Sequence, residues 1–525
     1  MTCTLMCYGL QFAAMEYWLY YYLLSATVCL ALYLFLSSLR PPATGGSRPQ
    51  LPPGPSALTV AGLLFFYGRG KFGTIIRLVR SWYGPVFTLR LKPSHPTIFV
   101  SDHAATHRAL VQCGAALADR PPATFSSRIF SSDQHDIASC SYGPLWSVLR
   151  RNLTGRVLHP SNLQRYAGAR RRAADVLVAG ITRQTRDGRV VVIEELLHRA
   201  VYHVLVCMCF GDGLDSDDVV ASVEAVQREF TTSAIGFQVL DVYTAVAKIV
   251  FRRTWKKLVS LRRRQEELLL PLIRARGEGG GAINAVSYVD SLLGLSIPED
   301  GSVRNLTEGE MVSLCSEFLA AGTDSTAAVA QWVMANLVDQ PEIQAKLRAE
   351  IRDVSGDGVF DEQNLSRMPY LKAVVLEGLR RHPPAQFVMP HAATTDGYDG
   401  TPDAGFHVPR HASVNFALAE MGLDEAVWPE AKRFRPERFL PGGEGADLHL
   451  TGGKGEIKMI PFGAGRRACP GIELSLLHLE YLVARLVSGF EWHAAVDGEQ
   501  VDFAERLELS IVMRRPLRAR VIPCS

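Results

Sequence analysis

The chain has 525 residues, with 56 Lys and Arg against 53 Asp and Glu and a formal net charge of +3. This balance excludes the strongly basic surface of a typical nucleic-acid-binding protein, so we expect no nucleic-acid partner. Hydrophobic residues make up 47% of the chain, which fits a globular protein with an added membrane segment. The ten cysteines are scattered without a CxxC pair, which indicates reduced thiols in a reducing compartment.

The first predicted element is a transmembrane helix at about residues 17–39. The stretch contains no charged residue and, at about 1.5 Å per residue, is long enough to cross a bilayer core of about 30 Å. A cleaved signal peptide is the alternative, but its apolar core would be shorter and preceded by basic residues. Arg40 and Arg48 follow the stretch, so the positive-inside rule places the remaining chain in the cytosol. We therefore expect residues 1–39 to form an uncleaved single-pass anchor.

A hinge and one large domain are expected after the anchor. Residues 40–56 are rich in proline and glycine, which predicts a semi-rigid linker. Residues 57–525 show short extended segments near both ends, mostly helical patterns between them, and no internal repeat. This order predicts a single mainly α domain of the α+β class with small β-sheets, rather than alternating βαβ units.

Two segments in the first half combine basic and aromatic residues. In YGPLWSVLRRNL, Trp146 and Arg150 lie four residues apart on a predicted helix, so they can form an aromatic–cation pair. Residues 251–264, FRRTWKKLVSLRRR, carry a denser basic cluster. Its simpler interpretation is a solvated helix face, and the alternative is contact with anionic lipid near the anchor.

A buried helix of about 32 residues, roughly 48 Å long, is predicted before the Gln-Pro pair at 340–341. It begins with a capping box formed by Thr307 and Glu310, and its flanks are apolar on nearly all sides. Gly322 and the polar residues 323–326 interrupt its middle, where hydroxyls can compete for backbone carbonyls and open the helix. A solvent-exposed face is the alternative, but polar groups inside a buried helix indicate a functional site.

Ionic groups recur further along the chain. The stretch LKAVVLEGLRRHPP reads as a helix ended by two prolines, with Glu377 and Arg380 three residues apart on one face. Such pairs are common and, on a surface, stabilise little. The stretch FRPERFLP then predicts a proline-rich loop that carries Arg438.

The loop PFGAGRRACPG, residues 461–471, places a single cysteine among glycines and arginines. Nearby positive charge favours the thiolate of Cys469, and Pro470 suits the first position of a helix whose dipole stabilises an anion. Gly463 allows the close approach of a flat ligand. A cysteine nucleophile would lack a local histidine partner here. One thiolate cannot complete a zinc or iron–sulfur site, but it can be the sole protein ligand of a haem iron.

Several motifs together resemble those of cytochrome P-450, the haem-thiolate monooxygenases, in their plant microsomal form. FGAGRRACPG resembles the haem-binding loop of that family, AAGTDST its oxygen-activating helix, and EGLR its Glu-x-x-Arg helix. PERF resembles the loop that follows, WSVLR the haem-contacting helix, and LPPGP the hinge after the anchor. The motifs stand in the family's order, so the resemblance covers roughly residues 40–520.

The resemblance implies a binding site for haem b, the iron protoporphyrin IX. Cys469 would be the metal ligand, with Phe462 and Gly463 beside it on the proximal face. Trp146, Arg150 and Arg467 would bind the haem propionates, and Ala321 and Gly322 would line the oxygen groove. Glu377, Arg380 and Arg438 would form a structural ion-pair triad.

The implied catalytic residues include two departures from the family's usual pattern. Asp324 and Ser325 take the positions of an acid–alcohol pair that delivers protons, where the family usually has threonine instead of Ser325. Serine keeps the hydroxyl but lacks the methyl group that fixes the rotamer, and Thr326 is a candidate substitute. His391 stands where many members have an arginine facing a propionate. It could donate a hydrogen bond there, or be an ordinary loop histidine.

The function implied is insertion of one atom of O2 into a hydrophobic small molecule at the endoplasmic reticulum membrane. Electrons from NADPH would arrive through a separate NADPH-cytochrome reductase, with a small haem protein as a second candidate donor. Candidate contacts for an acidic donor are Arg433, Lys454, Lys458 and Arg466. A haem-thiolate hydroperoxide isomerase or dehydratase is an alternative, and a non-catalytic haem-binding protein is another. The acid–alcohol pair disfavours both, and the intact cysteine loop also disfavours the isomerase or dehydratase.

An apolar substrate pocket is expected between the segments at 121–142, at 223–247, at 314–321 and after Pro384. Aromatic and aliphatic side chains of these segments could line the pocket, although any core contains such residues. The candidates are Phe125, Phe130, Phe230, Phe237, Phe318, Phe387 and Val388.

Overall fold

The computed structural model describes residues 51–525 except 68–71, 93–94, 187–189, 214–215, 242–243, 279–286, 300, 357–359, 395–397, 402–405, 411, 454, 497 and 525. The predicted anchor, most of the hinge, and Lys454 lie outside these residues. Within them, no single helix is both long and apolar enough to cross a bilayer. The segments Asp217–Asp241 and Thr244–Val250 meet that test only as a pair bent by 119°.

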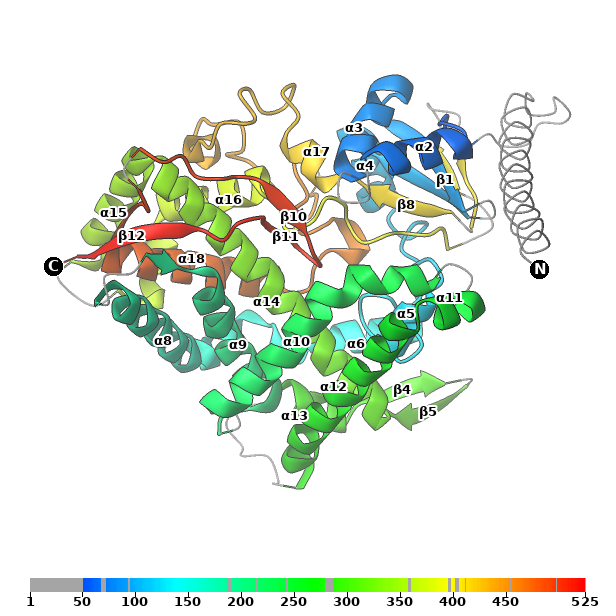
Figure 1. Ribbon diagram of the computed structural model, residues 1–525, viewed down its shortest axis with the longest axis horizontal. Coiled ribbons are helices and arrows are strands. Elements are labelled where there is room, and N and C mark those ends of the chain that lie inside the picture. The colour runs from blue at the N-terminus through cyan, green and yellow to red at the C-terminus, as the bar shows by residue number, and fades with distance from the viewer. Residues whose placement is uncertain are drawn as a thin grey trace, which may run out of the picture.

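Helices dominate the described chain (Figure 1). In the first half they are α2 (Ala57–Tyr67), α3 (Phe72–Tyr83), α4 (His103–His107), α5 (Phe125–Phe130), α6 (Pro144–Asn152), α7 (Pro160–Leu163), α8 (Ala167–Arg186), α9 (Glu194–Phe210), α10 (Asp217–Phe237), α11 (Thr244–Val250) and α12 (Arg252–Glu278). In the second half they are α13 (Tyr288–Leu293), α14 (Glu308–Asp339), α15 (Pro341–Ser355), α16 (Pro369–Arg381), α17 (Leu418–Gly422) and α18 (Ile472–Gly489). Short 3-10 or π turns are η2 (Arg108–Gln112), η3 (Leu153–Val157), η4 (Gln164–Tyr166), η5 (Gln238–Asp241), η6 (Glu362–Arg367), η7 (Pro436–Phe439) and η8 (Gly465–Arg467).

The strands form small sheets at the periphery of the helices. They are β1 (Val86–Lys92), β2 (His95–Val100), β3 (Val191–Val192), β4 (Ser296–Glu299), β5 (Ser302–Asn305), β6 (Tyr398–Thr401), β7 (Phe406–Val408), β8 (Ser413–Phe416), β9 (Phe490–Ala494), β10 (Glu505–Leu507), β11 (Ile511–Met513) and β12 (Arg518–Pro523). One sheet has the order β1-β2-β8 and another β3-β12-β9, while β4–β5, β6–β7 and β10–β11 pair as antiparallel strands. In the first sheet β2 runs antiparallel to β1 and parallel to β8, with Val100 opposite Phe416.

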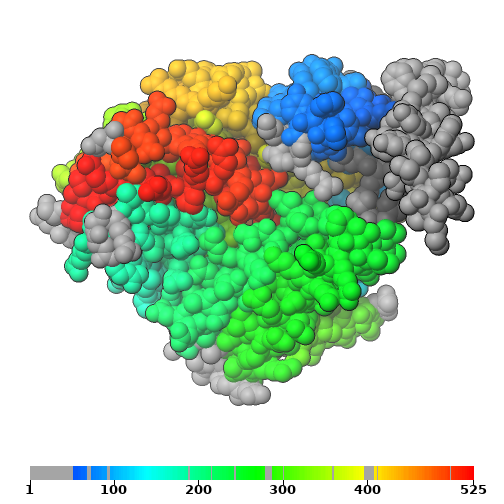
Figure 2. Space-filling view, in the orientation of Figure 1, coloured from blue at the N-terminus to red at the C-terminus, as the bar shows by residue number. Residues whose placement is uncertain are grey.

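The predicted fold class, mainly α with small sheets, is therefore confirmed. The core is built around α14, which is buried along most of its length and packs against α9, α12, α16 and α18. Figure 2 shows the helices of residues 190–280 filling the lower part of the molecule, with the N-terminal sheet region and the C-terminal segments above them.

The long central helix agrees with its predicted bounds. Thr307 Oγ1 accepts a hydrogen bond from the Glu310 amide at 3.2 Å, and the Glu310 carboxylate accepts one from the Thr307 amide at 2.7 Å. The expected opening at 323–326 does not occur, since α14 continues through these residues. The Thr323 and Ser325 hydroxyls instead donate to the carbonyls four residues earlier, at 2.8 and 2.9 Å, without interrupting the helix.

Candidate active site

A cavity of about 330 Å³ lies between α14, α6 and the cysteine loop. Its wall is mostly apolar and includes many of the predicted site residues, which come from three separate segments of the chain. These residues are Trp146, Arg150, Ala321, Gly322, Ser325, Thr326, Phe462, Gly463, Arg467 and Cys469. The other candidates, Asp324, His391 and the ion-pair triad, lie behind this wall rather than on it.

Cys469 lies on the cavity wall, in a turn just before α18. Its amide donates to the Phe462 carbonyl at 2.8 Å, and the Gly471 amide donates to its Sγ at 3.3 Å. The helix begins at Ile472, two residues later than predicted, so Pro470 belongs to the turn. Burial raises the pKa of the Cys469 thiol, while the Gly471 amide and the Arg150 guanidinium oppose that rise.

Two glycines give the cysteine loop its shape. Gly463 and Gly465 have φ values of +69° and +68°, in the left-handed region that L side chains rarely adopt. A Cβ atom at Gly465 would also lie 1.8 Å from the Leu110 carbonyl oxygen. Only glycine therefore allows this loop to pack against η2.

The predicted pair of Trp146 and Arg150 is present, with the guanidinium 5.5 Å from the ring centroid. Arg467 lies closer over the same ring, at 4.6 Å. Arg150 also donates to the Ala468 carbonyl at 2.6 Å. The indole nitrogen of Trp146 is buried without a hydrogen-bond partner among the described residues. The site thus holds an unused donor beside two guanidinium groups.

Arg467 connects the cysteine loop to the segment 118–140. Its guanidinium donates to the carbonyls of Ala118 and Cys140, both at 2.7 Å. Burial lowers the pKa of Arg467 to about 10. Its Nη1 also donates to the Ile137 carbonyl at 3.3 Å, which leaves two of its five N–H groups for a ligand in the cavity.

Arg120 is a wall residue that the sequence reasoning missed. It donates to Ala138 at 2.7 Å and to Pro390 at 2.8 Å, and burial together with Arg467 lowers its pKa to about 9. The available signal was an arginine beside Asp119 in the stretch before Pro121. Glu317, on the cavity-facing side of α14, was also missed, although it is the one charged residue between Met311 and Gly322.

His391 lies close to these arginines but off the cavity wall. Its Nδ1 donates to the Leu117 carbonyl at 2.6 Å, and its Nε2 is buried without a hydrogen-bond partner in the described chain. Burial and the Arg120 charge lower the pKa of His391 to about 3. At neutral pH the ring is therefore uncharged and Nε2 is an acceptor, so donation from this atom would require protonation.

Asp324 points away from the cavity toward α9, whereas its neighbours Ser325 and Thr326 line the wall. Its Oδ1 lies 3.8 Å from His198 Nδ1, and neither atom has a hydrogen-bond partner among the described residues. Burial raises the pKa of Asp324 to about 6, and burial with the Arg228 charge lowers that of His198 to about 3. Asp324 thus changes protonation near neutral pH beside an uncharged imidazole.

The ion-pair triad is assembled behind the cysteine loop. Arg380 makes two hydrogen bonds to the Glu377 carboxylate, at 2.6 and 2.7 Å, and Arg438 Nε lies 3.4 Å from the same group. The three side chains are fully buried. Glu377 also accepts from the Arg435 amide at 2.7 Å, so it connects α16 to η7.

The predicted apolar pocket residues divide into two groups. Phe318, Phe387 and Val388 line the cavity. Phe130 instead packs on Phe230, with ring centroids 4.5 Å apart, in a separate core beneath α10 and α12. Phe237 belongs to that core, and Phe125 packs on Trp255 beside it. The sequence could not separate the two groups because both consist of large apolar residues.

Comparison with known proteins places these features in one family. The family description "Cytochrome P450" matches residues 52–522. Cytochrome P450 89A9 of Arabidopsis thaliana is 41% identical over 491 residues, which cover 91% of this chain and 94% of the relative. Flavonoid 3'-monooxygenase of Arabidopsis thaliana is 27% identical, covering 89% of this chain and 90% of the relative. A zebra fish cytochrome P450 structure with progesterone has a TM-score of 0.71 at 24% identity, covering 85% of this chain and 97% of the other. The chain therefore belongs to the cytochrome P450 family and is a monooxygenase of that family.

Proposed function

We propose that the protein is a haem-thiolate monooxygenase that inserts one oxygen atom of O2 into a hydrophobic small molecule, using electrons from NADPH delivered by a separate reductase. The observation that carries this proposal is the position of Cys469. Its thiol lies on the wall of a largely apolar cavity that Ser325 and Thr326 also line. The test is the carbon-monoxide difference spectrum of the reduced protein. A strongly red-shifted Soret band is expected, and a band typical of histidine ligation would contradict the proposal.

The residues around the cavity fit haem b by charge. Arg120, Arg150 and Arg467 lie on the wall, and among the described residues no direct ion pair joins any of them to a carboxylate, although Asp119, Asp136 and Glu317 act on Arg120 at longer range. Buried positive charge without a partner is costly. Two propionates would compensate it, and the unused indole N–H of Trp146 could donate to one of them. Haem held by Cys469 would supply oxygen activation, because a thiolate ligand favours O–O cleavage.

The proton path in this proposal starts at Asp324 and ends at the cavity. Asp324 takes protons from the side of α9 and α10 and passes them to the hydroxyl of Ser325 or Thr326. Ser325 donates to a carbonyl of its own helix at 2.9 Å, so its hydroxyl must rotate to serve the cavity. Thr326 is the second candidate, and variants that remove each hydroxyl separately would show which one is used.

Replacing Asp324 by asparagine is expected to lower product formation about 100-fold, the lower range for losing a positioned proton donor. Since the protonated acid is the donor, the wild-type rate should fall as the pH rises through about 6, the pKa of Asp324. The variant should lack that ionisation. The measurement is kcat between pH 5 and 8, with Asp339→Asn at the end of the same helix as control. An unchanged pH profile in the Asp324 variant would contradict this role.

Electron delivery is proposed to occur from the side of the cysteine loop. Arg433 and Arg466 are exposed there, and Lys458 hydrogen-bonds the Glu444 carbonyl. Arg466 also donates to the Tyr142 hydroxyl at 2.7 Å. These positive groups support docking of an acidic partner.

A membrane-facing end is proposed from two exposed apolar groups. Phe65 and Phe66 on α2 are each 84% exposed, and Ile249 and Val250 on α11 are 78% and 65% exposed. Both helices lie toward the same end of the molecule in Figure 1. Apolar side chains exposed in this way favour contact with a bilayer.

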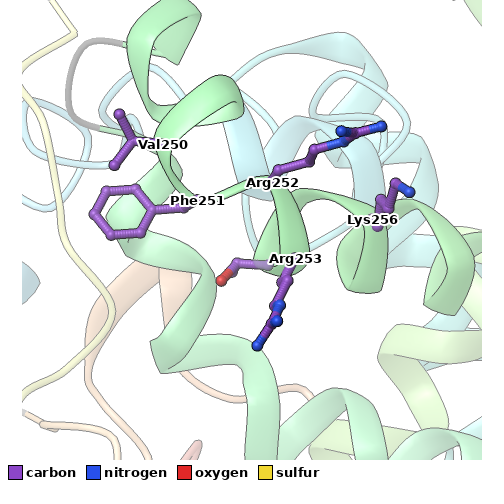
Figure 3. A pocket seen from close by; sticks show the side chains of 6 residues that line it. Val250, Phe251, Arg252, Arg253 and Lys256 are labelled. Carbon is purple, nitrogen blue, oxygen red and sulfur yellow. The ribbon is translucent and has the colours of Figure 1, made fainter.

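Basic residues follow directly after α11. In Figure 3, Val250 and Phe251 lie together on one side of the turn, while Arg252, Arg253 and Lys256 point away from them. All three basic side chains are exposed. This separation supports insertion of the apolar group with the cations at lipid headgroups, where each cation contributes about 1 kcal/mol.

Removing the charges of Arg252, Arg253 and Lys256 by substitution with glutamine should weaken this contact. In the full chain reconstituted in nanodiscs, amide exchange over 244–256 is expected to slow several-fold when anionic lipid replaces neutral lipid. The triple variant should lose that difference. The control removes three exposed charges on another surface, Arg165, Arg171 and Arg172, and should keep it. Exchange that does not depend on lipid charge in the wild type would contradict the proposed contact.

A further inference from the structure

Glu317 is an acidic residue on the otherwise apolar side of the cavity. It precedes Ala321 by four residues and Ser325 by eight, so the three lie along one face of α14. All three line the cavity. Leu314 and Phe318 are its helical neighbours on the wall.

The carboxylate of Glu317 is partly but not fully satisfied by the protein. Its Oε2 accepts from the Ile137 amide at 3.0 Å, and its Oε1 accepts from the Ala138 amide at 2.7 Å. A carboxylate offers about four lone-pair sites. The two amides therefore leave capacity on both oxygens for a ligand in the cavity.

The electrostatic surroundings of Glu317 favour a positive ligand. Burial, reinforced by the nearby Asp136 carboxyl, raises the pKa of Glu317, and the Arg120 charge opposes this only in part. Asp136 is itself buried and hydrogen-bonded to Ser139 at 2.6 Å. With a pKa of about 8, Glu317 is mostly protonated at pH 7 in the empty cavity, and a cation beside it would lower that pKa and stabilise the ionised carboxylate. The haem propionates would at the same time neutralise the positive charge of the arginines near the cysteine loop.

Resting on the proposed monooxygenase function, we propose that Glu317 is a specificity-determining residue that binds the cationic ammonium group of an otherwise apolar substrate. The apolar remainder would extend along α14 toward Ser325. Eight residues of helix correspond to about 12 Å. The oxidised position would therefore lie about that far from the nitrogen, at the opposite end of the ligand.

The alternative is that Glu317 has a purely structural role, in which its hydrogen bonds hold residues 137–138 against α14. The two roles differ in their dependence on ligand charge. Losing a fastening contact would disturb the binding of all ligands alike, whereas losing a counter-charge affects only a cation.

The experiment compares 4-phenylbutyltrimethylammonium with its uncharged isostere, in which tert-butyl replaces trimethylammonium. Neither compound has a nitrogen lone pair that could bind iron. Dissociation constants are measured by equilibrium dialysis with the full-length holoenzyme in nanodiscs, corrected for empty nanodiscs. The wild type should prefer the cation. Glu317→Gln should weaken cation binding at least about 30-fold, the lower end of the range for removing one partner of a buried charge pair. Its affinity for the isostere should change less than about twofold.

Glu317→Asp retains the charge on a shorter side chain and should keep the preference for the cation, which guards against loss of fold in the glutamine variant. If Glu317→Gln bound both ligands more weakly by the same factor, the role of Glu317 would be structural and the proposal would be overturned. So would a wild type that binds the cation no more tightly than the isostere. The reduced carbon-monoxide spectrum of the same samples reports the haem thiolate separately. A normal spectrum without cation preference overturns this inference alone, and an abnormal spectrum overturns the proposed function.

Discussion

Replacing Cys469 by alanine is expected to abolish product formation, because oxygen activation depends on the thiolate ligand. The reduced protein should also lose the red-shifted carbon-monoxide band. Cys469→Ser is the sharper variant, since it retains size and a polar atom while replacing sulfur with a harder oxygen. The measurements are haem content, the difference spectrum and NADPH-dependent turnover with reductase.

Cys209→Ala serves as the matched control for the cysteine substitution. Cys209 is fully buried in α9 and is not part of the cavity wall. Removing its thiol tests whether deletion of any buried sulfur disturbs the enzyme, and turnover should be retained. If the Cys469 variants kept both the spectrum and NADPH-dependent product, another group would have to be the ligand.

Replacing Glu377 by glutamine is expected to lower the free energy of unfolding by about 3–5 kcal/mol, the range for removing one partner of a buried ion pair. The carboxylate accepts from Arg380 at 2.6 Å and from the Arg435 amide at 2.7 Å, with Arg438 3.4 Å away. Glutamine cannot accept on both sides, so it would leave two guanidinium groups buried without their counter-charge. The measurement is the urea concentration at the midpoint of unfolding, recorded together with the m-value.

Glu267→Gln is the control for the triad. Glu267 pairs with Arg263 on α12 at 3.5 Å, with both side chains more than half exposed. Removal of this charge should lower the free energy of unfolding by no more than about 0.5 kcal/mol. Equal midpoints for the Glu377 and Glu267 variants would show that the triad does not support the cysteine side of the fold.

The parts of this protein that could be predicted from sequence are those encoded by short-range patterns. The bounds of α14 follow from a capping box and a Gln-Pro pair, and the pair of Trp146 and Arg150 follows from helical spacing. The cysteine loop is a local motif, and its glycines imply its positive φ values. The start of α18 was misplaced because Pro470 is acceptable both in a turn and at the first position of a helix.

The remaining features depend on contacts between distant segments. Glu317 meets Ala138 across 179 positions of the chain, and Arg467 meets Ala118 across 349. The sequence pattern within one segment does not indicate which distant segment it contacts. The positions of Glu317 and Arg120 on the cavity wall could therefore be found only from the structure. The same limit applies to Phe130 and Phe230, whose burial is predictable but whose assignment to a core other than the cavity wall is not.

The hydrogen bonds from Arg467 and Arg120 to the carbonyls of residues 118–140 constrain how this enzyme can diverge. These guanidinium groups would hold the cofactor, and they also shape the segment that covers the substrate. A mutation that remodels that segment would displace both arginines, so selection for a new substrate there would be penalised through weaker cofactor retention. Arg120 also donates to the carbonyls of Met389 and Pro390, so the segment after Pro384 is constrained in the same way. Descendants of this sequence should therefore acquire new specificity mainly through apolar wall residues of α14 such as Leu314 and Phe318.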